Sequence, residues 1–431
     1  MVRSILEAYR KAYGGLSREV WLLSVAIFVN RFGTMVLPFL TLYLTTKLGF
    51  TEFSAGQILS VYGLGAIAGA YLGGKLTRKV GAIRLQIVLL CLATGMFLVL
   101  PFCTTWNSLA IGIFFQSLFS EGVRPPNATA ISDFSTPETL SRAYALQRTA
   151  INLGFSFGPV IGGLLTTVGF HWLFIVDAIT TFGCAVCLFS FFGFSHQSRT
   201  TDSSLLKSGK TSNNESTVGP WGDIPFLGFL GLILMTAIVF FQFHATYPLY
   251  LKQHYQLNEV MIGLMYAVNT VIVVAFEMLL VDRAKTWPVL LTIGWGCFFV
   301  GVGFGSLPWS SGIWLCVLSM VILTVGEMLS APLASGWVAT RSANKDVGAY
   351  MGWYTMTWSV AAVVGPAIGT WIYERDKAQV WHWAMVMAFV VLAGFYAFDR
   401  AMAKATNSDA VHPNDYAGTS PVERAEGESA E

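Results

Sequence analysis

Eight ionisable side chains of this sequence stand inside long apolar stretches, where a charge is costly and usually serves a function. A carboxylate there can bind and release a proton, and a nearby arginine changes how readily it does so. Glu121 and Arg124 are three residues apart, so on a helix they share one face and can pair. We interpret the set as candidate proton-coupling and substrate residues within a membrane, with Asp177 and Glu277 as secondary candidates. Its members are Arg31, Glu121, Arg124, Arg148, Asp177, His244, Glu277 and Glu327.

Helix geometry sets the depth of three of these residues. Arg31 is about eleven residues into its apolar stretch, and Glu121 and Glu327 are each about fifteen residues into theirs. At about 1.5 Å per residue, all three come near the middle of the membrane. The alternatives are structural: a static ion pair for Glu121 and Arg124, gate or interface contacts for Asp177 and Glu277, bonds from Arg148 and Asn152 to freed carbonyls, and a hydrogen-bonded histidine at His244.

The composition excludes an ordinary soluble domain. Of 431 residues, 54% are hydrophobic and 12% are charged, against about a quarter charged in soluble proteins. The basic residues are scattered and the net charge is +2, so nothing indicates a nucleic-acid partner. The sequence holds no metal-ligand cluster, phosphate-binding loop or nucleophile–base pair. We therefore expect no enzymatic activity, no metal and no cofactor.

Twelve apolar stretches, each long enough to cross a bilayer, follow one another along the chain. They predict an all-α membrane protein with twelve transmembrane helices in two pseudo-symmetric six-helix halves, residues 1–194 and 223–400. Residues 195–222 are predicted to form a polar cytoplasmic linker, and residues 401–431 a disordered cytoplasmic tail. The approximate limits of the spans are 20–45, 54–74, 86–103, 107–132, 143–167, 171–194, 223–250, 259–281, 288–307, 312–338, 348–373 and 380–399.

Lysine and arginine counts predict the orientation, because cytoplasmic segments carry an excess of both. With both termini inside, nineteen of these residues fall on the cytoplasmic side and four on the outside. The protein is therefore expected to be a multi-pass protein of the inner (plasma) membrane with both termini in the cytoplasm.

The two halves repeat each other, which indicates duplication of one six-helix unit. Transporters built from such repeats bind substrate and coupling ions at the interface between the repeats. Four features recur at offsets of 210, 206, 206 and 207 residues: Pro38 with Pro248, Glu121 with Glu327, Pro126 with Pro332, and Gly158-Pro159 with Gly365-Pro366.

A glycine-proline motif marks the fifth span. Gly154, Gly158 and Gly162 recur at every fourth residue, which lets a neighbouring helix approach closely, and Pro159 bends a helix by removing a backbone hydrogen bond. This Gly-x3-Gly-Pro-x2-Gly-Gly string, which ends at Gly163, resembles the antiporter motif of helix 5 in drug:proton antiporters of the major facilitator superfamily. The resemblance implies a hinge in helix 5. It also implies a central cavity lined by helices 1, 4, 7 and 10, which carry Arg31, Glu121, Arg124, His244 and Glu327.

The loop between the second and third spans partly resembles the helix 2–3 motif of the same superfamily. Both glycines match, but Arg78 stands where relatives carry an acid that helps to latch the cytoplasmic gate. We therefore expect an acid from another loop, Asp133 or Asp346, to supply the opposite charge. The positions of the motif in this sequence are Gly74, Arg78, Gly81 and Arg84.

A shorter resemblance points to another transporter family. Asn30-Arg31-Phe32-Gly33 resembles the helix 1 signature of proton-coupled peptide transporters, with Asn30 and Ile27 at the positions of the two acids of that signature. It implies an alternative function, a symporter that takes up peptides or small organic anions at the arginines.

We predict a proton-coupled exporter, an antiporter of small organic molecules or drugs that works by rocker-switch alternating access. Glu121, with Glu327, would exchange a proton for substrate, while Arg31 and Arg124 set their acidity. The expected partners are a small-molecule substrate, protons and the lipid bilayer, and the chain is expected to act as a monomer. A membrane sensor without transport activity is a further alternative.

Overall fold

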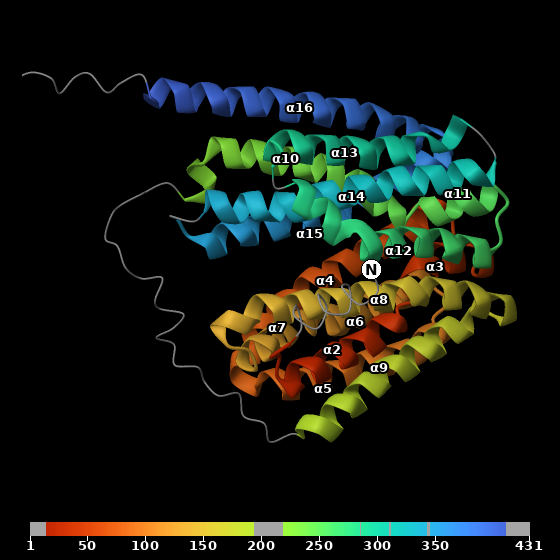
Figure 1. Ribbon diagram of the computed structural model, residues 1–431. Coiled ribbons are helices and arrows are strands. Elements are labelled where there is room, and N and C mark those ends of the chain that lie inside the picture. The colour runs from red at the N-terminus through yellow and green to blue at the C-terminus, as the bar shows by residue number, and fades with distance from the viewer. Residues whose placement is uncertain (1–13, 194–218, 285, 310–311, 343–344, 411–431) are drawn as a thin grey trace, which may run out of the picture.

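The computed structural model describes residues 14–193, 219–284, 286–309, 312–342 and 345–410, and within these ranges all regular structure is helical (Figure 1). The predicted all-α membrane fold is confirmed. Eleven helices of the described part are long and apolar enough to cross a membrane. The twelfth predicted span corresponds to α6 (Trp106–Gly122), whose 17 residues fall just short of that length, and to α7 (Arg124–Asp133), which follows it at once.

The first span of the N-terminal half is broken, and its other spans are long helices. That span consists of α2 (Arg18–Phe32), α3 (Val36–Leu42) and the π-helical turn η1 (Tyr43–Lys47). The remaining elements are α4 (Glu52–Val80), α5 (Ala82–Val99), the 3-10 turn η2 (Leu100–Phe102), α8 (Pro137–Val168) and α9 (His171–Phe192).

The C-terminal half repeats this pattern, including the broken first span. Its seventh span consists of α10 (Ile224–Phe240), the 3-10 turn η4 (Phe241–Phe243) and α11 (Tyr247–Gln253). The remaining elements are the 3-10 turn η3 (Pro220–Gly222), α12 (Glu259–Ala284), α13 (Val289–Gly305), the 3-10 turn η5 (Leu307–Trp309), α14 (Ile313–Arg341), α15 (Val347–Arg375) and α16 (Gln379–Ala410).

The end of the chain differs from the prediction. Residues 401–410, predicted to begin a disordered tail, continue α16 instead. The local sequence Ala-Met-Ala-Lys-Ala explains the difference, because alanine, methionine and lysine have high helix propensity. Residues 411–431 of the predicted tail and 194–218 of the predicted linker lie outside the described residues, so the limits of the two domains stay a prediction.

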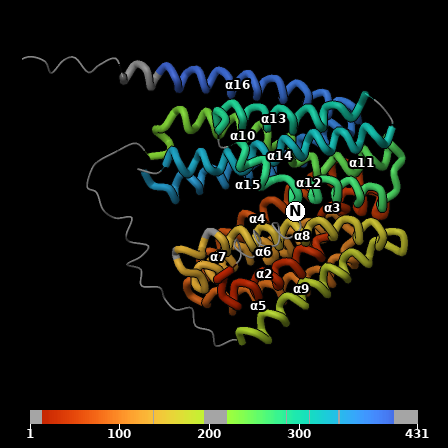
Figure 2. Tube along the Cα trace, in the orientation of Figure 1, coloured from red at the N-terminus to blue at the C-terminus, as the bar shows by residue number. Residues whose placement is uncertain are grey.

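The helices form two groups that pack side by side. Figure 1 shows α2–α9 as one group and α10–α16 as the other, and the trace in Figure 2 follows the same division. The groups lie closest together where α3 and α11 meet, and they separate toward the end where α9 finishes and α10 begins. We call the first end the distal end and the second the linker end.

Two equivalent contacts join the halves. A Cβ atom placed on Gly56 of α4 would lie 2.8 Å from the carbonyl oxygen of Pro366 in α15, and one on Gly263 of α12 would lie 2.3 Å from that of Pro159 in α8. The two glycines are 207 residues apart, and so are the two prolines. Because only glycine lets helix backbones approach this closely, each half places a glycine against the proline of the other.

Side chains close the distal end between the halves. The backbone N–H of Phe53, in the first turn of α4, donates a hydrogen bond of 3.1 Å to Glu374 Oε2, near the end of α15. The side-chain amide of Gln253 in α11 donates to Glu52 Oε1 over 3.2 Å. A carboxylate at a helix N-terminus is stabilised by the exposed N–H groups and by the helix dipole. The distal end is therefore held by polar contacts as well as by packing.

Candidate functional site

Arg31 and Glu121 lie face to face beside the break in the first span. Arg31 stands in the last turn of α2 with its side chain 11% exposed, and its Nη1 lies 3.9 Å from Oε1 of Glu121 near the end of α6. Arg124, at the start of α7, forms an ion pair with Glu121 Oε2. The hydroxyl of Tyr62, from α4, donates a hydrogen bond of 3.1 Å to Glu121 Oε1. The pair expected from the spacing of Glu121 and Arg124 is thus present, with Tyr62 and Arg31 added to it.

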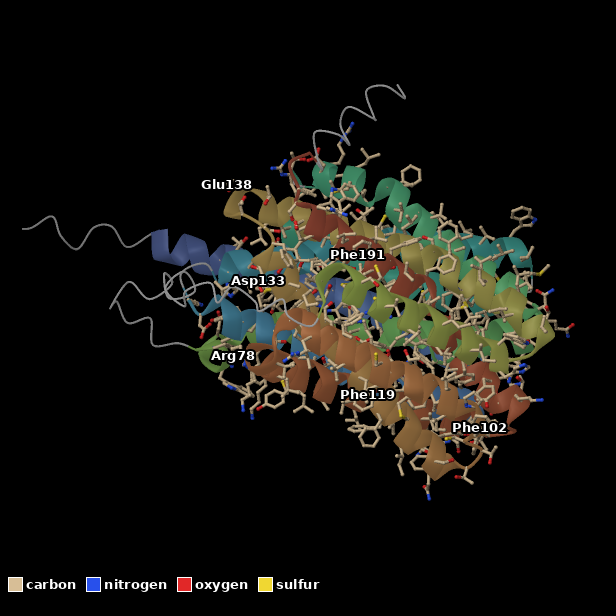
Figure 3. All side chains as sticks on the ribbon, turned by 90° about the horizontal axis from the view of Figure 1, so that it is seen from below. Arg78, Phe102, Phe119, Asp133, Glu138 and Phe191 are labelled. Atoms are coloured by element: carbon tan, nitrogen blue, oxygen red, sulfur yellow. The ribbon has the colours of Figure 1, made fainter. Side chains whose placement is uncertain are left out.

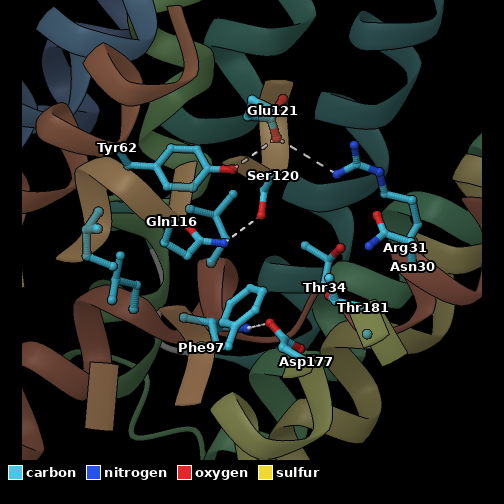
Figure 4. A pocket seen from close by; sticks show the side chains of 15 residues that line it. Asn30, Arg31, Thr34, Tyr62, Phe97, Gln116, Ser120, Glu121, Asp177 and Thr181 are labelled. Carbon is cyan, nitrogen blue, oxygen red and sulfur yellow. Dashed lines mark hydrogen bonds and ion pairs between the residues drawn. The ribbon is translucent and has the colours of Figure 1, made fainter. Parts of the chain in front are cut away.

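A pocket that is partly open to solvent adjoins this cluster (Figure 4). Five spans of the N-terminal half supply its walls. Gln116 and Ser120, on α6, form a hydrogen bond of 2.9 Å at its side. Apolar side chains form one part of the lining: Val36, Leu37, Leu40, Phe97 and Ile113. The pocket therefore combines a charged end with an apolar wall.

The structure does not gather all the predicted cavity residues into this pocket. Three of the charged residues predicted from the sequence line it: Arg31, Glu121 and Asp177. The Arg124 side chain is 64% exposed and lies beside the pocket rather than in its lining. Four further predicted residues lie on other parts of the bundle: Arg148, Asn152, His244 and Glu327. The central cavity predicted for helices 1, 4, 7 and 10 stays a prediction, and each half carries its own polar cluster.

Asp177 holds the break in the first span. Its carboxylate, from α9, accepts hydrogen bonds from the backbone N–H of Met35 at 3.0 Å and of Val36 at 3.1 Å. These N–H groups have no partner within the helix, because they stand at the start of α3. The contact thus supplies a structural reason for a carboxylate at this position, beside the functional role that the sequence suggested.

Glu327 has a matching cluster in the C-terminal half. The amide of Asn269, from α12, donates a hydrogen bond of 2.9 Å to Glu327 Oε2 on α14 and one of 3.0 Å to Thr324. Asn269 lies 207 residues after Tyr62, and Glu327 lies 206 residues after Glu121. The two glutamates therefore share a position and a type of donor, but Glu327 has an uncharged partner where Glu121 has Arg124.

Arg148 and Glu277 connect the two halves. Arg148 on α8 forms an ion pair with Glu277 on α12, and their side chains are 54% and 16% exposed. The structure does not show the structural alternative for Arg148, a bond to carbonyls freed near the bend, because its guanidinium pairs with this carboxylate instead. Asn152, one turn further along α8, is half-buried, and its backbone carbonyl accepts a hydrogen bond from Ser156. Glu277 is thus an interface residue, one of the two roles that the sequence left open for it.

His244 lies at the break in the seventh span, between η4 and α11. Its ring meets the ring of Phe243 edge to face, with centroids 5.3 Å apart, and it lies 6.4 Å from the ring of Tyr266. Within the described residues the structure shows these ring contacts for His244, and not the hydrogen bond that the structural alternative required.

The glycines of the helix 5 motif face two neighbours. A Cβ atom on Gly154 would lie 2.7 Å from Cβ of Arg31, and one on Gly158 would lie 3.0 Å from the carbonyl oxygen of Thr34. One on Gly162 would lie 3.0 Å from the ring of Phe39 in α3. Gly163 instead faces α12, where a Cβ atom would lie 2.4 Å from the carbonyl oxygen of Glu259. The motif therefore packs α8 against the broken first span and against the other half at once.

The residues of the helix 2–3 motif lie at the linker end. Figure 3 shows Arg78 and Asp133 at the same end of the molecule, and Gly81 ends α4 with φ of +93°, which favours glycine. A Cβ atom on Gly74 would have room, 3.8 Å from Cβ of Pro125. Arg78 forms no ion pair with another described residue. Asp346 caps its own helix by accepting from the N–H of Ala349, so the structure does not bring it to Arg78. Arg84 stands in the first turn of α5.

A family model described as the Major Facilitator Superfamily matches residues 23–330 and 280–420 of this chain. The chain belongs to the major facilitator superfamily. It is 24% identical over 360 residues to the uncharacterized MFS-type transporter YqjV of Bacillus subtilis (strain 168), with 81% of this chain and 85% of the relative covered. It is 22% identical over 351 residues to the class H tetracycline resistance protein of Pasteurella multocida, with 80% and 86% covered. A solved structure of peptide transporter POT in complex with sulfate superposes with a TM-score of 0.72 at 17% identity, covering 90% of this chain and 96% of that one.

The resemblance predicted from the sequence is therefore confirmed at the level of the superfamily. This facilitator is a multi-span membrane transporter of small molecules and not an enzyme, since that is what the superfamily comprises. The likeness to the peptide transporter, at 17% identity, shows a shared fold alone.

Several polar residues of this facilitator could not be recognised as site residues from their type. Neutral residues such as Tyr62, Gln116 and Asn269 cost little in an apolar stretch and so do not stand out. One signal was present in the sequence, because Tyr62 and Asn269 recur at the same 207-residue offset as the glycine-proline pairs. Their pairing with the glutamates becomes evident only when the helices are packed.

A charged cluster at the linker end of the C-terminal half was also missed. Asp223, 4% exposed, caps α10 by accepting from the N–H of Phe226. It also accepts two hydrogen bonds from Arg341, at 3.0 and 2.6 Å, and one of 2.8 Å from Lys345. The Tyr350 hydroxyl donates a further one of 3.0 Å. The cluster ties the start of α10 to the end of α14 and the start of α15.

Proposed function

We propose that this facilitator is a proton-coupled exporter of small organic molecules or drugs that works by alternating access. The observation that carries the proposal is the pair of equivalent glutamates, Glu121 and Glu327. Glu121 accepts a hydrogen bond from α4, and Glu327 accepts one from α12. These are the two helices whose glycines contact the opposite half. A change of charge at either glutamate therefore acts on a helix of the moving interface.

The distribution of lysine and arginine indicates which end of the molecule faces the cytoplasm. These residues favour a cytoplasmic linker end, where α9 and α16 finish and α10 begins. The distal end then faces outward. It is closed by two hydrogen bonds between the halves, from Phe53 to Glu374 and between Gln253 and Glu52. We infer that the structure represents the state open to the cytoplasm.

The two glutamates have different parts in the proposed proton exchange. The carboxylate of Glu121 is neutralised by Arg124 in this conformation, so it can accept a proton only after that arginine moves away. Asn269 carries both a donor and an acceptor in its amide, so it can hydrogen-bond to Glu327 in either protonation state. Glu327 can thus exchange a proton without rearrangement of its partner.

Export is supported by two observations. The helix 5 motif, which resembles that of drug:proton antiporters, packs on both the broken first span and the other half. The relatives of the chain also include a tetracycline resistance protein. We assign the hinge role to this motif, because its glycines let α8 slide against two neighbours without side chains in the way.

A pH gradient across proteoliposomes tests the proposal. An antiporter takes up substrate into vesicles with an acidic interior, because protons leave as substrate enters, whereas a symporter requires an acidic exterior. We expect accumulation of tetracycline, or of another compound from a panel of dyes, peptides and organic anions, in acid-loaded vesicles alone. Uptake driven by external acid would instead establish the symporter, which Arg31 beside the pocket favours as the second candidate. Counterflow absent for the whole panel would favour a sensor.

A further inference from the structure

The side chain of Gln242 connects the break of the seventh span to α15. It is 4% exposed and belongs to η4, the short turn at that break. Its amide nitrogen donates a hydrogen bond of 2.8 Å to the carbonyl oxygen of Gly365 and one of 3.0 Å to that of Ile238. Its amide oxygen accepts one of 3.0 Å from the hydroxyl of Thr246. Because the buried amide is bonded through both its nitrogen and its oxygen, it is held in one orientation.

Glycine in α15 makes room for this side chain. A Cβ atom on Gly369 would lie 1.8 Å from Oε1 of Gln242, and one on Gly365 would lie 3.1 Å from Cβ of Phe241. Pro366, next to Gly365, is the residue whose carbonyl oxygen meets a glycine of the other half. Gln242 therefore fixes the segment of α15 through which the two halves touch.

The equivalent segment of α8 is held differently. Gly162 stands 207 residues before Gly369. A Cβ atom on Gly162 would lie 3.0 Å from the ring of Phe39 and 3.2 Å from Cβ of Met35, so apolar groups stand where the C-terminal half has the amide. The break of the first span is bonded to Asp177 of α9 instead. Apolar contacts are not directional, so they permit a sliding of α8 that the hydrogen bonds of the amide oppose in α15.

A second bond attaches α15 to the seventh span at the linker end. The hydroxyl of Tyr350, in the first turn of α15, donates to Asp223, which caps α10. Tyr350 lies fifteen residues before Gly365, which is about 22 Å along a helix. Two attachments this far apart resist both translation and tilting of α15 relative to α10.

We propose that Gln242 is a positioning residue that fastens the glycine-proline bend of α15 to the seventh span. The two glycine-proline helices then differ in their motion, because α15 moves with the seventh span as one unit whereas α8 slides against the first span. The inference rests on the alternating access of the proposed function. It does not depend on the substrate, on the direction of transport or on the coupling proton.

Hydrogen exchange of the purified full chain in nanodiscs tests this difference without any variant. Backbone amides exchange when a segment opens locally, so the rate measures the local stability of each helix. Corrected for intrinsic rates, residues 367–373 of α15 should exchange about tenfold more slowly than residues 160–166 of α8, since hydrogen bonds hold only the first of these segments to its neighbouring span. Equal exchange in the two segments, or faster exchange in α15, would overturn the proposal.

Two variants test the role of the amide. Gln242→Met removes the hydrogen bonds and keeps the length of the side chain, so exchange in residues 367–373 should rise about tenfold while residues 160–166 stay unchanged. Gly369→Ala should have the same effect, because its Cβ atom displaces the amide, and the double variant should add nothing further. Gln86→Met is the matched control, since this buried amide bonds to a carbonyl of its own helix. Unchanged exchange in Gln242→Met would contradict the assignment, and the wild-type comparison stands even if the variants fail to fold.

Transport separates positioning from stability, and this inference from the proposed function. Gln242→Met should slow counterflow of tetracycline, or of the panel compound that accumulates, several-fold relative to Gln86→Met at a similar unfolding temperature. Counterflow at the control rate would show that the amide has no part in the motion. If proton-driven transport occurs but the two segments exchange alike, the inference fails while the proposed function stands. If the segments differ as expected but no pH gradient drives transport, the proposed function fails while the assignment of Gln242 stands.

Discussion

Tyr62 and Asn269 occupy equivalent positions of the two halves, 207 residues apart, and each donates a hydrogen bond to the glutamate of its own half. Both a phenol and an amide can also accept a hydrogen bond, so neither fixes its glutamate in one protonation state. The halves differ in their cations, since Arg124 pairs with Glu121 whereas Glu327 accepts from an uncharged amide. Duplication has thus kept the geometry of the pair and changed its charge.

The first prediction concerns Glu121. Glu121→Gln removes the titratable proton and keeps the size of the side chain, so it should abolish pH-gradient-driven transport while substrate binding and counterflow continue. Proteoliposome uptake with and without a pH gradient measures both. Glu138→Gln, at an exposed position near the start of α8, is the control. A variant that still builds a full substrate gradient would pass the role to Glu327, and one that loses binding as well would make Glu121 a ligand or a packing residue.

The second prediction concerns the helix 5 hinge. Gly158→Leu should stop conformational exchange, because even a Cβ atom there would meet the carbonyl oxygens of Thr34 and Phe32 at 3.0 and 3.2 Å. Insertion into the membrane should survive, because it depends on hydropathy. Gly183→Leu is the matched control, since no atom lies within 4 Å of a Cβ atom there. Counterflow at the wild-type rate in Gly158→Leu would contradict the hinge.

The long apolar spans and the repeat were sufficient to predict the fold, because hydropathy and internal symmetry are local properties of the sequence. The break in the first span was not predictable in the same way. It falls between Phe32 and Val36, ahead of Pro38, and it is held by Asp177 from a helix more than 140 residues later. The individual residues of the pocket could not be predicted either, because they depend on packing between distant segments. A neutral Tyr62 becomes part of a site only through its contact with Glu121.

The third prediction concerns the ion pair across the halves. Arg148→Glu and Glu277→Arg should each slow transport, because each leaves two like charges at the interface, and the double variant should recover part of the loss. For a pair that is partly exposed we expect a coupling energy of about 0.5–1 kcal/mol, or a few-fold in rate. A double-mutant cycle on initial transport rates measures it. Strictly additive losses would show that the ion pair does not contribute to the transport cycle.

The fourth prediction concerns Asp223. Burial alone would raise the pKa of its carboxyl group, but hydrogen bonds from Arg341, Lys345 and Tyr350 outweigh burial and place this pKa below its ordinary value. Asp223→Asn leaves two cations without their acid, so the free energy of unfolding should fall by about 3 kcal/mol at neutral pH. Thermal unfolding in detergent at pH 7 measures the loss.

The pH dependence of that loss follows from the direction of the pKa shift. A group whose pKa is lowered by folding stabilises the folded state above its unfolded pKa, near about 3.9 for an aspartate. The difference between wild type and Asp223→Asn should therefore be constant above about pH 5 and shrink as the pH falls further. A difference that stays constant down to pH 3 would exclude this carboxylate as its source.

The two glycine–proline contacts between the halves have a geometric consequence. Gly56 against Pro366 and Gly263 against Pro159 are two points, and two points define a line. A rigid half can turn about that line while both contacts persist, so the line is the rotation axis of the proposed motion. The displacement of an atom then grows with its distance from this axis. The largest displacement therefore falls at the linker end, for example at the Asp223 cluster, whereas Glu374 bonds Phe53, three residues from Gly56, and moves little. The linker end is thus the best place for distance probes that follow a single turnover.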